Sequence, residues 1–299
     1  MSNWVQKYQN NIKQFEPMGR HSSWRCGGFA DFFFQPQRVE ELSAFLREKS
    51  DSVEIVWLGL GSNLLVRDGG FRGCVVSTTK ALREMIWEDG NKSLYVQSGV
   101  SCAKVAREAA AKNRKGLEFL IGIPGSVGGA VKMNAGAYGW EFSDILSSIE
   151  VYNLVTKKIE TLDKDDINFS YRSSSNLENK VIISATLIGT EGDPALIKSR
   201  LKENIKYRKD TQPSAIYNAG SVFKNTDQYS AGELIDKAEL KGFSIDGVKV
   251  STKHANFFVA SKGANSSSLY KLVNHVKEVV DSKFGVSLQK EILFVGKFD

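Results

Sequence analysis

The segment from Gly116 to Gly139, GLEFLIGIPGSVGGAVKMNAGAYG, constrains the fold of this chain more than any other stretch. Seven of its 24 residues are glycine, whereas the average of 26 glycines in 299 residues predicts about two. Because a glycine inside a helix or strand costs roughly 0.5–1 kcal/mol relative to alanine, this density is typical of backbone that wraps closely around another group. We therefore predict a binding loop here.

A second glycine-rich loop, Gly59-Leu60-Gly61-Ser62-Asn63 through Gly69-Gly70, directly follows the apolar run Glu54 to Leu58. Two such loops are typical of a large phosphate-bearing ligand held by backbone N–H groups. The loop does not match G-x-G-x-x-G, because Leu64 stands at the place of the third glycine, and no G-K-[ST] follows. A doubly wound dinucleotide domain and a P-loop NTPase are therefore disfavoured. By itself, Gly59-x-Gly61 is also typical of a tight turn.

The size and composition are those of a folded protein with more than one domain. A length of 299 residues is enough for two or three domains with buried cores. The 41% hydrophobic and 25% charged content is ordinary for such proteins. No run approaches the roughly 18 apolar residues of a membrane span, and the first residues, MSNWVQKYQNNIKQF, lack the apolar core of a signal peptide. We therefore expect a cytoplasmic protein with no membrane partner.

The cysteines and histidines show no pattern typical of a metal site or of a disulfide framework. Cys26, Cys74 and Cys102 are odd in number and far apart, with no C-x-x-C pair. The three histidines show no H-E-x-x-H or comparable spacing. We predict buried thiols in a reducing compartment and no metal ion.

The net charge of +6 is compatible with two kinds of partner. Clustered lysine and arginine residues are typical of nucleic-acid binding, but here the basic residues are dispersed among acidic ones, with no run of five or six. Polyanionic small ligands such as nucleotides account for the charge equally well. Because no nucleic-acid recognition motif accompanies the charge, we expect small-molecule ligands and no nucleic-acid partner.

Hydrophobic periodicity and capping signals predict both helices and strands in the first 190 residues. Residues 1–20 are expected to form a short lead-in helix, and Phe32-Phe33-Phe34 a buried strand. Helices are expected near 39–46 and from the N-cap Ser101 to Lys112. Further strands are predicted at Glu54–Leu58, Cys74–Ser77, Leu94–Gly99, Ile149–Leu154, Lys158–Leu162 and Val181–Ile188.

The last third of the chain carries helix signals of its own. Asp193-Pro194 is typical of an N-cap and a first helical residue, and one face of the following helix is expected to carry Ile197, Leu201 and Ile205. Ser230-x-x-Glu233 matches a capping box. Strands are predicted at 256–260 and 291–295, with an amphipathic helix between them formed by Leu269, Leu272, Val273, Val276 and Val280. We expect a domain boundary near 190–210.

Eight blocks of this sequence occur in the order found in one enzyme family. They are Trp24-Arg25-Cys26-Gly27-Gly28, GLGSNLL from Gly59, GIPGSVGGA from Gly122, MNAGAYG from Met133, YRSS from Tyr171, AGSVFKN from Ala219, HANF from His254 and Leu288-x-x-Glu291. With these blocks the chain resembles the UDP-N-acetylenolpyruvoylglucosamine reductase (MurB) family of flavoenzymes, in its shorter type II form. The resemblance covers roughly residues 20–296.

The resemblance implies an α+β fold, with a two-part FAD-binding module of the vanillyl-alcohol-oxidase (PCMH) type and a C-terminal α+β substrate-binding domain. It places the FAD-binding subdomains at 1–78 and 79–205, and the substrate-binding domain at 206–299. Non-covalent FAD is expected, because residues 59–70 contain no histidine or cysteine to link a flavin. The residues that the resemblance assigns to FAD are Gly59, Gly61, Ser62, Asn63, Gly122, Ile123, Pro124, Gly125, Ser126, Gly128, Gly129, Ala130, Asn134 and Gly136.

The implied reaction reduces an enolpyruvyl ether to a lactyl ether in peptidoglycan precursor synthesis, with NADPH as hydride donor. A protein site for this reaction stabilises an enolate and delivers one proton. By resemblance, Ser221 is the proton donor, Arg172 holds the carboxylate, and Glu291 orients groups or assists proton transfer. The implied substrate-binding residues are Tyr171, Lys224 and Asn225. The expected partners are NADPH and the UDP-sugar substrate, bound by a monomer.

Two other interpretations stay open from the residues. A flavin oxidase of the same superfamily, such as a sugar or lactone oxidase, would lack the Ser221–Lys224–Asn225 block. A basic nucleotide- or RNA-binding protein without catalytic activity would be colourless. Taken singly, Ser221 is also typical of a turn, Arg172 of a surface ion pair and Glu291 of a strand edge.

Overall fold

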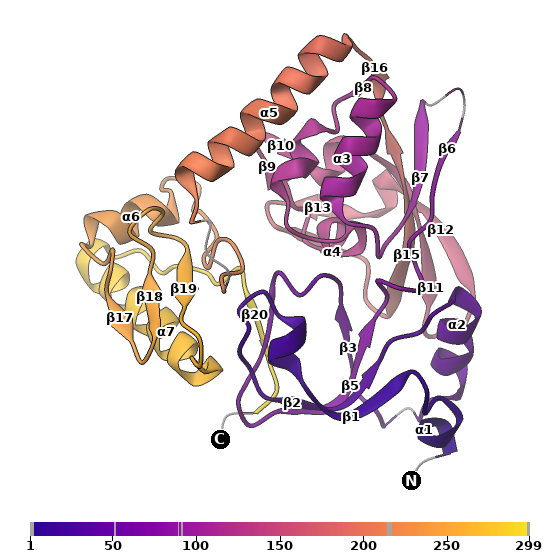
Figure 1. Ribbon diagram of the computed structural model, residues 1–299, viewed down its shortest axis with the longest axis horizontal. Helices are drawn as coiled ribbons and strands as arrows, with labels where there is room; N and C mark the ends of the chain where they lie inside the picture. The colour runs from indigo at the N-terminus through magenta and orange to yellow at the C-terminus, as the bar shows by residue number, and fades with distance from the viewer. Residues whose placement is uncertain (1–2, 51, 89, 91, 214–216, 298–299) are drawn as a thin grey trace. The chain divides into compact units, whose positions relative to one another are not determined.

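The computed structural model describes residues 3–50, 52–88, 90, 92–213 and 217–297, which form two compact units built from helices and strands (Figure 1). Each unit is assembled from segments that are far apart in the sequence. Unit 1 comprises Met1–Ile12, Phe34–Val53 and Val76–Arg208. Unit 2 comprises Lys13–Phe33, Glu54–Val75 and Lys209–Asp299.

Unit 1 contains an antiparallel sheet of five strands in the order β12-β11-β15-β7-β6. Ile149 of β11 pairs with Ala185 of β15, which pairs with Val96 of β7, and all three are 0% exposed. Such cross-strand apolar pairs stabilise a sheet on its buried face. Four of these strands confirm the sequence predictions: β7 (Ser93–Gln97), β11 (Leu146–Asn153), β12 (Ile159–Asp163) and β15 (Lys180–Ile188). The edge strand β6 (Met85–Glu88) was not predicted.

The helices that follow β7 share one buried core with this sheet. Val105 of α3 and Val127 of α4 belong to the same apolar cluster as Ile149 of β11, and each such buried side chain contributes roughly 1.5–3 kcal/mol. As predicted, α3 begins at the N-cap Ser101, whose hydroxyl accepts a hydrogen bond from the N–H of Lys104. The other elements of unit 1 are α1 (Asn3–Lys7), α2 (Val39–Glu48), α3 (Cys102–Ala111), β8 (Arg114–Lys115), η3 (Glu118–Gly122), α4 (Val127–Lys132), β9 (Gly136–Ala137), β10 (Trp140–Glu141), η4 (Phe142–Asp144), η5 (Lys164–Asp166), β13 (Asn168–Ser170), β14 (Ser173–Ser175) and β16 (Thr190–Glu191).

Helix α5 (Pro194–Thr211) begins where the Asp-Pro pair predicts. The carboxylate of Asp193 accepts a hydrogen bond from the N–H of Ala195 at 2.7 Å. Of the apolar residues expected on one face, Ile197 is buried and Leu201 packs against the core of unit 1. Ile205 follows at the same four-residue spacing in α5, so that it shares their face as predicted, but it is 50% exposed.

The first 20 residues do not form the single lead-in helix that their polarity predicts. Helix α1 is confined to Asn3–Lys7, and Ile12–Pro17 form strand β1; residues 1 and 2 lie outside the described part of the chain. Strand β1 pairs with β2. Pairing with a partner strand, rather than local propensity, decides the conformation of such a short polar segment.

Unit 2 contains a four-stranded sheet in the order β1-β2-β5-β3 and an antiparallel three-stranded sheet, β17-β18-β19. A parallel pair joins β20 to β4, with Leu293 opposite Leu64 and Val295 opposite Val66. This pair ties the C-terminal segment to the strand that follows the first glycine loop. The elements are β1 (Ile12–Pro17), η1 (Met18–His21), β2 (Phe29–Phe34), β3 (Ile55–Leu58), β4 (Leu64–Val66), β5 (Phe71–Ser77), α6 (Ala231–Lys237), β17 (Ser244–Ile245), β18 (Val248–Val250), β19 (Phe258–Ala260), α7 (Ser266–Phe284) and β20 (Leu293–Val295).

Helix α7 carries the predicted apolar stripe along its whole length. All five predicted residues are 0% exposed, as expected for helical spacing toward a core: Leu269, Leu272, Val273, Val276 and Val280. The side chain of Asn265 caps its start by accepting from the N–H of Ser268. The helix ends at Gly285, which has a φ of 68°, a left-handed conformation that glycine adopts without steric cost.

Helix α6 begins after Ser230 as predicted, but the capping box is absent. Ser230 occupies the N-cap position and its side chain makes no capping hydrogen bond. The side-chain oxygen of Asn225 accepts from the N–H of Ala231 instead, at 3.0 Å. An N–H at a helix start needs one acceptor, and here a loop residue upstream of the motif supplies it.

The three cysteines are buried and free of disulfides, as predicted: Cys26, Cys74 and Cys102. Burial raises the pKa of Cys26 and the pKa of Cys102 to about 12. Since the thiolate is the reactive form, these two thiols are inert near neutral pH.

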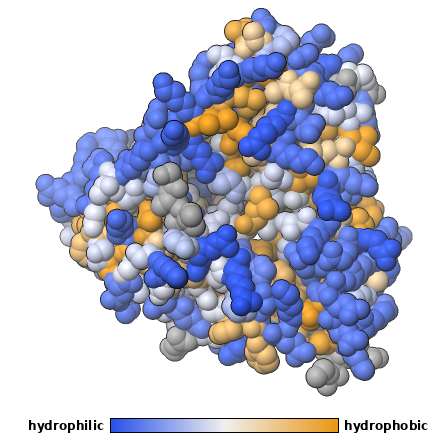
Figure 2. Space-filling model, in the orientation of Figure 1, coloured by the Kyte–Doolittle hydropathy of each residue, from blue (hydrophilic) through white to orange (hydrophobic). Residues whose placement is uncertain are grey.

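The face drawn in Figure 2 is covered mostly by hydrophilic side chains, with apolar ones in small groups. Within the described ranges, no helix is both long and apolar enough to cross a membrane.

Asp68 ties the loop after β4 to the start of α7. Its two carboxylate oxygens accept from the N–H groups of Ser266 at 3.0 Å and Ser267 at 2.8 Å. Burial alone would raise the pKa of Asp68, but hydrogen bonds from Ser267 and Ser266 outweigh burial and hold the pKa below its usual value. A carboxyl group with a lowered folded-state pKa stabilises the fold above its unfolded-state pKa, about 3.9, and this stabilisation is lost as the pH falls through the folded-state value.

We expect Asp68→Asn to lower the free energy of unfolding at pH 7 by about 1–2 kcal/mol. The difference from wild type should shrink as the pH falls below about 4, because the unfolded chain then binds a proton at Asp68 that the folded carboxylate, with its lowered pKa, still resists. Urea unfolding at pH 7, 5 and 3 measures both effects. Asp31→Asn is the control, because Asp31 pairs at 3.0 Å with the exposed Arg72 and such pairs are worth at most about 1 kcal/mol. Equal losses in the two variants would contradict a capping role for Asp68.

Candidate active site

The first glycine loop, Gly59–Asn63, connects β3 to β4 in unit 2. Gly61 has a φ of 68°, and a Cβ atom at this position would overlap the carbonyl oxygen of His21, so that only glycine fits. Among the residues that the structure describes, the N–H groups of Leu60, Gly61 and Ser62 donate to no protein acceptor. Successive N–H groups of this kind are typical of an anion-binding nest.

The second glycine loop, Gly122–Gly129, joins η3 to α4 in unit 1. Two of its glycines are required by packing. A Cβ at Gly122 would lie 2.5 Å from the ring of Tyr138, and a Cβ at Gly128 would lie 2.8 Å from the Cβ of Ser98. These two glycines therefore allow Tyr138 and Ser98 to lie close to the loop backbone, whether or not the loop also contacts a ligand.

Other residues of the second loop leave donors and space for a ligand. Ser126 forms an isolated antiparallel bridge with Ser101, and within the described chain the N–H groups of Gly125 and Ser126 donate to no protein acceptor. A Cβ at Gly129 would meet only the Oγ of Ser126, at 3.7 Å. N–H groups without a protein acceptor, beside space for a ligand, fit the diphosphate of a cofactor such as FAD.

Ser221 and Glu291 are far apart in sequence but lie on neighbouring segments of unit 2. The N–H of Glu291 donates to the carbonyl of Val222 at 2.8 Å. On its other side, the Ser221 segment forms an antiparallel bridge with Phe257. The backbone next to Ser221 is therefore bonded directly to Glu291, which brings together two of the three predicted catalytic residues.

The first glycine loop contacts the same segment. The side-chain amide of Asn63 donates to the carbonyl of Glu291 at 3.1 Å, and the N–H of Leu293 donates to the carbonyl of Asn63 at 2.9 Å. These bonds continue the parallel pairing of β4 with β20. Unit 2 thus groups a predicted FAD-binding loop with the segments that carry Ser221 and Glu291.

Asn256 is a further residue of this group, to which the sequence motifs assign no role. Its side chain is buried, accepts from the N–H of Phe223 at 2.9 Å and donates to the carbonyl of Phe223 at 2.8 Å. Its own carbonyl accepts from the N–H of Val222 at 2.9 Å. The side chain of Asn256 therefore satisfies the two backbone groups of Phe223, as a neighbouring strand would do. The sequence feature that could have indicated this role was the position of Asn256 in the HANF block.

Lys224 and Asn225 continue the segment that starts at Ser221. The N–H of Lys224 donates to the carbonyl of Gln289 at 2.8 Å. The amide oxygen of Asn225 caps α6. Both predicted substrate-binding residues are thus held on the same backbone as Ser221, so their spacing from it is constrained.

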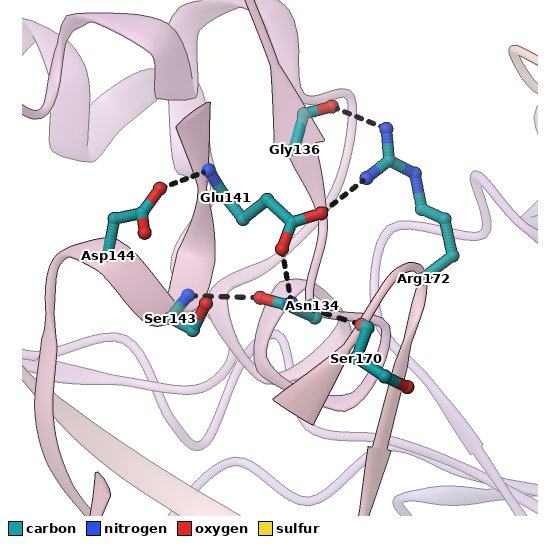
Figure 3. A network of polar contacts seen from close by, with 7 residues as sticks. All are labelled: Asn134, Gly136, Glu141, Ser143, Asp144, Ser170 and Arg172. Atoms are coloured by element: carbon teal, nitrogen blue, oxygen red, sulfur yellow. Dashed lines mark hydrogen bonds and ion pairs between the residues drawn. The ribbon is translucent and has the colours of Figure 1, made fainter. Parts of the chain in front are cut away.

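Arg172 lies in unit 1, in the turn between β13 and β14, with a φ of 53°. Its Nη2 donates to the carbonyl of Gly136 at 3.0 Å, and its Nη1 lies 3.7 Å from Oε1 of Glu141 (Figure 3). The guanidinium also lies 4.8 Å from the ring centroid of Tyr171. Such contacts on several sides orient the planar guanidinium, which is the condition for binding an anionic group in one geometry.

The side chain of Asn134 points into the protein. It is 1% exposed, and its amide nitrogen donates to Oε2 of Glu141 at 2.8 Å and to the carbonyl of Ser170 at 3.1 Å. Its amide oxygen accepts from the N–H of Ser143 at 3.0 Å (Figure 3). Its N–H donates to the carbonyl of Val131 at 3.1 Å, so that the side-chain amide and the main-chain N–H of Asn134 are both engaged within the protein.

The predicted site residues fall into two groups. Unit 2 groups Ser221, Glu291, Lys224, Asn225 and the loop Gly59–Asn63; unit 1 groups Arg172 and Tyr171 with Gly136 and contains the loop Gly122–Gly129. In the described part of the chain, no cluster of three or more histidine, cysteine, aspartate or glutamate side chains is arranged to hold a metal ion.

Comparison with protein families identifies the class. Residues 30–161 match an FAD binding domain, and residues 212–295 match the UDP-N-acetylenolpyruvoylglucosamine reductase C-terminal domain. This combination defines an FAD-containing oxidoreductase, and it confirms the predicted α+β fold and the predicted cofactor.

Comparison with individual proteins identifies the family. UDP-N-acetylenolpyruvoylglucosamine reductase of Clostridium tetani is 38% identical over 289 residues, which cover 96% of this chain and 93% of that protein. The reductase of Methylococcus capsulatus is 39% identical over 95% of this chain and 93% of its own length. The crystal structure of the enzyme (MurB) from Thermus caldophilus matches with a TM-score of 0.80 and 29% identity, covering 95% of this chain and 98% of that one. The chain therefore belongs to the UDP-N-acetylenolpyruvoylglucosamine reductase (MurB) family, as its motifs predict.

Proposed function

We propose that this chain reduces UDP-N-acetylglucosamine enolpyruvate to UDP-N-acetylmuramate in peptidoglycan precursor synthesis, with NADPH as the hydride donor. Membership of the reductase family supports the substrate. Within the chain, the observation that carries the proposal is the 2.8 Å bond from the N–H of Glu291 to the carbonyl of Val222. This bond holds Ser221 and Glu291, the two residues proposed for proton transfer, on adjacent segments.

FAD, when bound, supplies a two-electron carrier that takes a hydride from NADPH and passes it to the methylene carbon of the enolpyruvyl group. We propose that Gly59–Asn63 and Gly122–Ala130, together with Asn134 and Gly136, bind FAD, and that main-chain N–H groups of the two glycine loops contact its diphosphate. The N–H groups of Gly61 and Ser126, which donate to no acceptor among the described residues, support this assignment. The FAD is expected to be dissociable, because residues 59–70 contain no histidine or cysteine.

Ser221 is proposed to deliver the proton to the carbon that bears the carboxylate. A serine hydroxyl is a weak acid near neutral pH, so that it acts only where neighbouring groups stabilise the developing charge. Lys224 and Asn225 follow on the same segment and supply a cation and an amide. Together with Tyr171, they are the proposed substrate-binding residues.

Arg172 and Glu291 complete the proposed catalytic set. The fork of Arg172 matches a carboxylate in a bidentate geometry and stabilises the enolate that forms beside it. Glu291 orients the reacting groups or assists proton transfer at the enolate.

We propose a monomer located in the cytoplasm, acting on small molecules and on no nucleic acid. In this proposal residues 1–78 and 79–205 bind FAD, and residues 206–299 bind the UDP-sugar. The match of residues 212–295 to the C-terminal domain of the reductases supports the last boundary.

We expect the purified protein with FAD to show flavin absorption bands that bleach on anaerobic addition of NADPH and return on addition of UDP-N-acetylglucosamine enolpyruvate. The enolpyruvyl group accepts the electrons, so UDP-N-acetylglucosamine, which lacks that group, should leave the flavin bleached. Denaturation should release all of the flavin, as expected for non-covalent binding. Bands that return only with oxygen, accompanied by hydrogen peroxide production from a sugar alcohol, would indicate an oxidase and overturn the proposal.

A further inference from the structure

The guanidinium of Arg172 is oriented by two groups that come from one short ladder. Strand β10 pairs with β9, which places Glu141 opposite Gly136. The carbonyl of Gly136 accepts from Nη2 of Arg172 at 3.0 Å, and Oε1 of Glu141 lies 3.7 Å from Nη1 (Figure 3). A Cβ at Gly136 would lie 3.0 Å from Nη1 and 3.2 Å from Cγ of Glu141. The β9–β10 pair therefore packs closely against the guanidinium group of Arg172.

Glu141 is itself held at both ends. Its N–H donates to Oδ2 of Asp144 at 2.8 Å, within a reciprocal capping box at the start of η4. Its Oε2 accepts from the side-chain amide of Asn134 at 2.8 Å, while Oε1 faces Arg172. A carboxylate with both oxygens engaged and its backbone capped has little rotational freedom.

Asn134 connects the two sides of this arrangement. The same amide nitrogen that donates to Glu141 also donates to the carbonyl of Ser170, two residues before Arg172. Because Asn134 is 1% exposed, its amide group is shielded from solvent. The buried amide of Asn134 thus holds both the carboxylate of Glu141 and the backbone segment that carries Arg172.

We infer that Glu141 is a positioning residue for Arg172, and that Asn134 acts through Glu141 to hold the guanidinium in its working orientation. The inference rests on the proposed role of Arg172 in stabilising the enolate. An exposed ion pair would not restrict a guanidinium in this way, but here the side chain of Arg172 is 18% exposed and that of Glu141 35%. Misplacing a catalytic group by a fraction of its contact distance lowers the rate of the chemical step.

A residue that acts through another has no further effect once the second residue is removed. If Glu141 serves Arg172, its substitution should slow the reoxidation of reduced flavin by the enolpyruvyl substrate, the step in which Arg172 acts. Reduction of the flavin by NADPH should not change. In an Arg172→Ala background, the loss of Glu141 should have no additional effect.

The chain offers a matched control for the removal of a glutamate. Glu160 also lies in unit 1, and its carboxylate accepts from the side-chain amide of Asn153 at 2.9 and 3.0 Å. Glu160→Ala therefore removes an asparagine–glutamate contact of the same kind without touching the Arg172 ladder.

The experiment compares Glu141→Ala, Arg172→Ala, the double variant and Glu160→Ala by stopped-flow flavin absorbance and by urea unfolding. We expect Glu141→Ala to slow reoxidation at least ~10-fold, to leave reduction by NADPH unchanged, and to unfold at nearly the same urea concentration as Glu160→Ala. The double variant should match Arg172→Ala within about 2-fold.

Four outcomes would overturn the inference. Additive losses in the double variant would mean that Glu141 acts independently of Arg172. Equal losses in both half-reactions of Glu141→Ala would assign it a structural role. An impaired Arg172→Ala beside a wild-type Glu141→Ala would remove this inference alone, whereas a wild-type rate for Arg172→Ala would remove the proposed role of Arg172 as well.

Discussion

Replacing Ser221 by alanine should slow the reoxidation of reduced flavin by UDP-N-acetylglucosamine enolpyruvate at least ~100-fold, the usual scale of acid–base contributions. The hydroxyl is the proposed source of the proton that ends the reaction, and alanine has no proton to give. Reduction of the flavin by NADPH needs no proton from Ser221. It should therefore proceed at close to the wild-type rate.

The backbone at Ser221 should tolerate the change. Val222 and Phe223 hold this segment through main-chain bonds to Asn256 and Glu291, and none of these bonds involves the serine hydroxyl. The two half-reactions are separated by anaerobic stopped-flow measurements of flavin absorbance, first with NADPH and then with the enolpyruvyl substrate.

Ser230→Ala is the matched control for this experiment. Ser230 is an exposed serine in the same unit, and its side chain makes no capping bond to α6. Both half-reactions of this variant should equal those of the wild type. Equal slowing of both half-reactions in Ser221→Ala would place Ser221 in binding or folding instead of in proton transfer.

Gly61→Ala should destabilise the protein by about 2–6 kcal/mol, because backbone strain and overpacking each cost roughly 1–3 kcal/mol. Gly61 has a φ of 68°, a conformation that strains an L-residue. In addition, the new Cβ would overlap the carbonyl oxygen of His21. Backbone cannot rotate away as a flexible side chain does, so the loop itself has to move.

Gly285→Ala separates the two causes. Gly285 has the same φ of 68° and ends α7, but no atom lies within 4 Å of a Cβ built there. Its replacement should cost about 1 kcal/mol, the strain alone. Urea unfolding of both variants measures the difference, and flavin absorbance after addition of FAD shows whether the Gly61 loop still binds its cofactor. If the two variants lost the same stability, the close approach to His21 would not explain the glycine.

Periodic and capped elements could be predicted from local sequence. The stripe of α7, the Ser101 cap of α3 and the Asp193 cap of α5 depend on residues within a few positions of one another. Local interactions of this kind are encoded directly in residue spacing. The family motifs likewise predicted the fold class and FAD.

Elements that depend on distant partners could not be predicted. Strand β1 forms in a polar stretch because it pairs with β2. Helix α6 is capped by Asn225 and not by Ser230, because the loop before the helix folds back on its first turn. Neither partner is visible in a short window of sequence.

The candidate site shows the same division. Its motifs named Ser221, Arg172 and Glu291, but gave no sign that Asn256 supports the Ser221 segment or that the side chain of Asn134 holds Glu141. A buried asparagine that binds backbone groups has the same letter as one that binds a ligand. Only the positions of its hydrogen-bond partners distinguish the two roles.

Residue identity and short spacing were enough to predict the family, the glycine positions of the two loops and the helices with strong periodicity. Contacts between distant residues depend on the folded chain: Glu291 meets the segment of Ser221, Asn63 meets Glu291, and Glu141 meets Arg172. Such contacts arise when burial of the core and pairing of strands bring remote segments together. Their geometry depends on the whole fold, so that no local pattern specifies it.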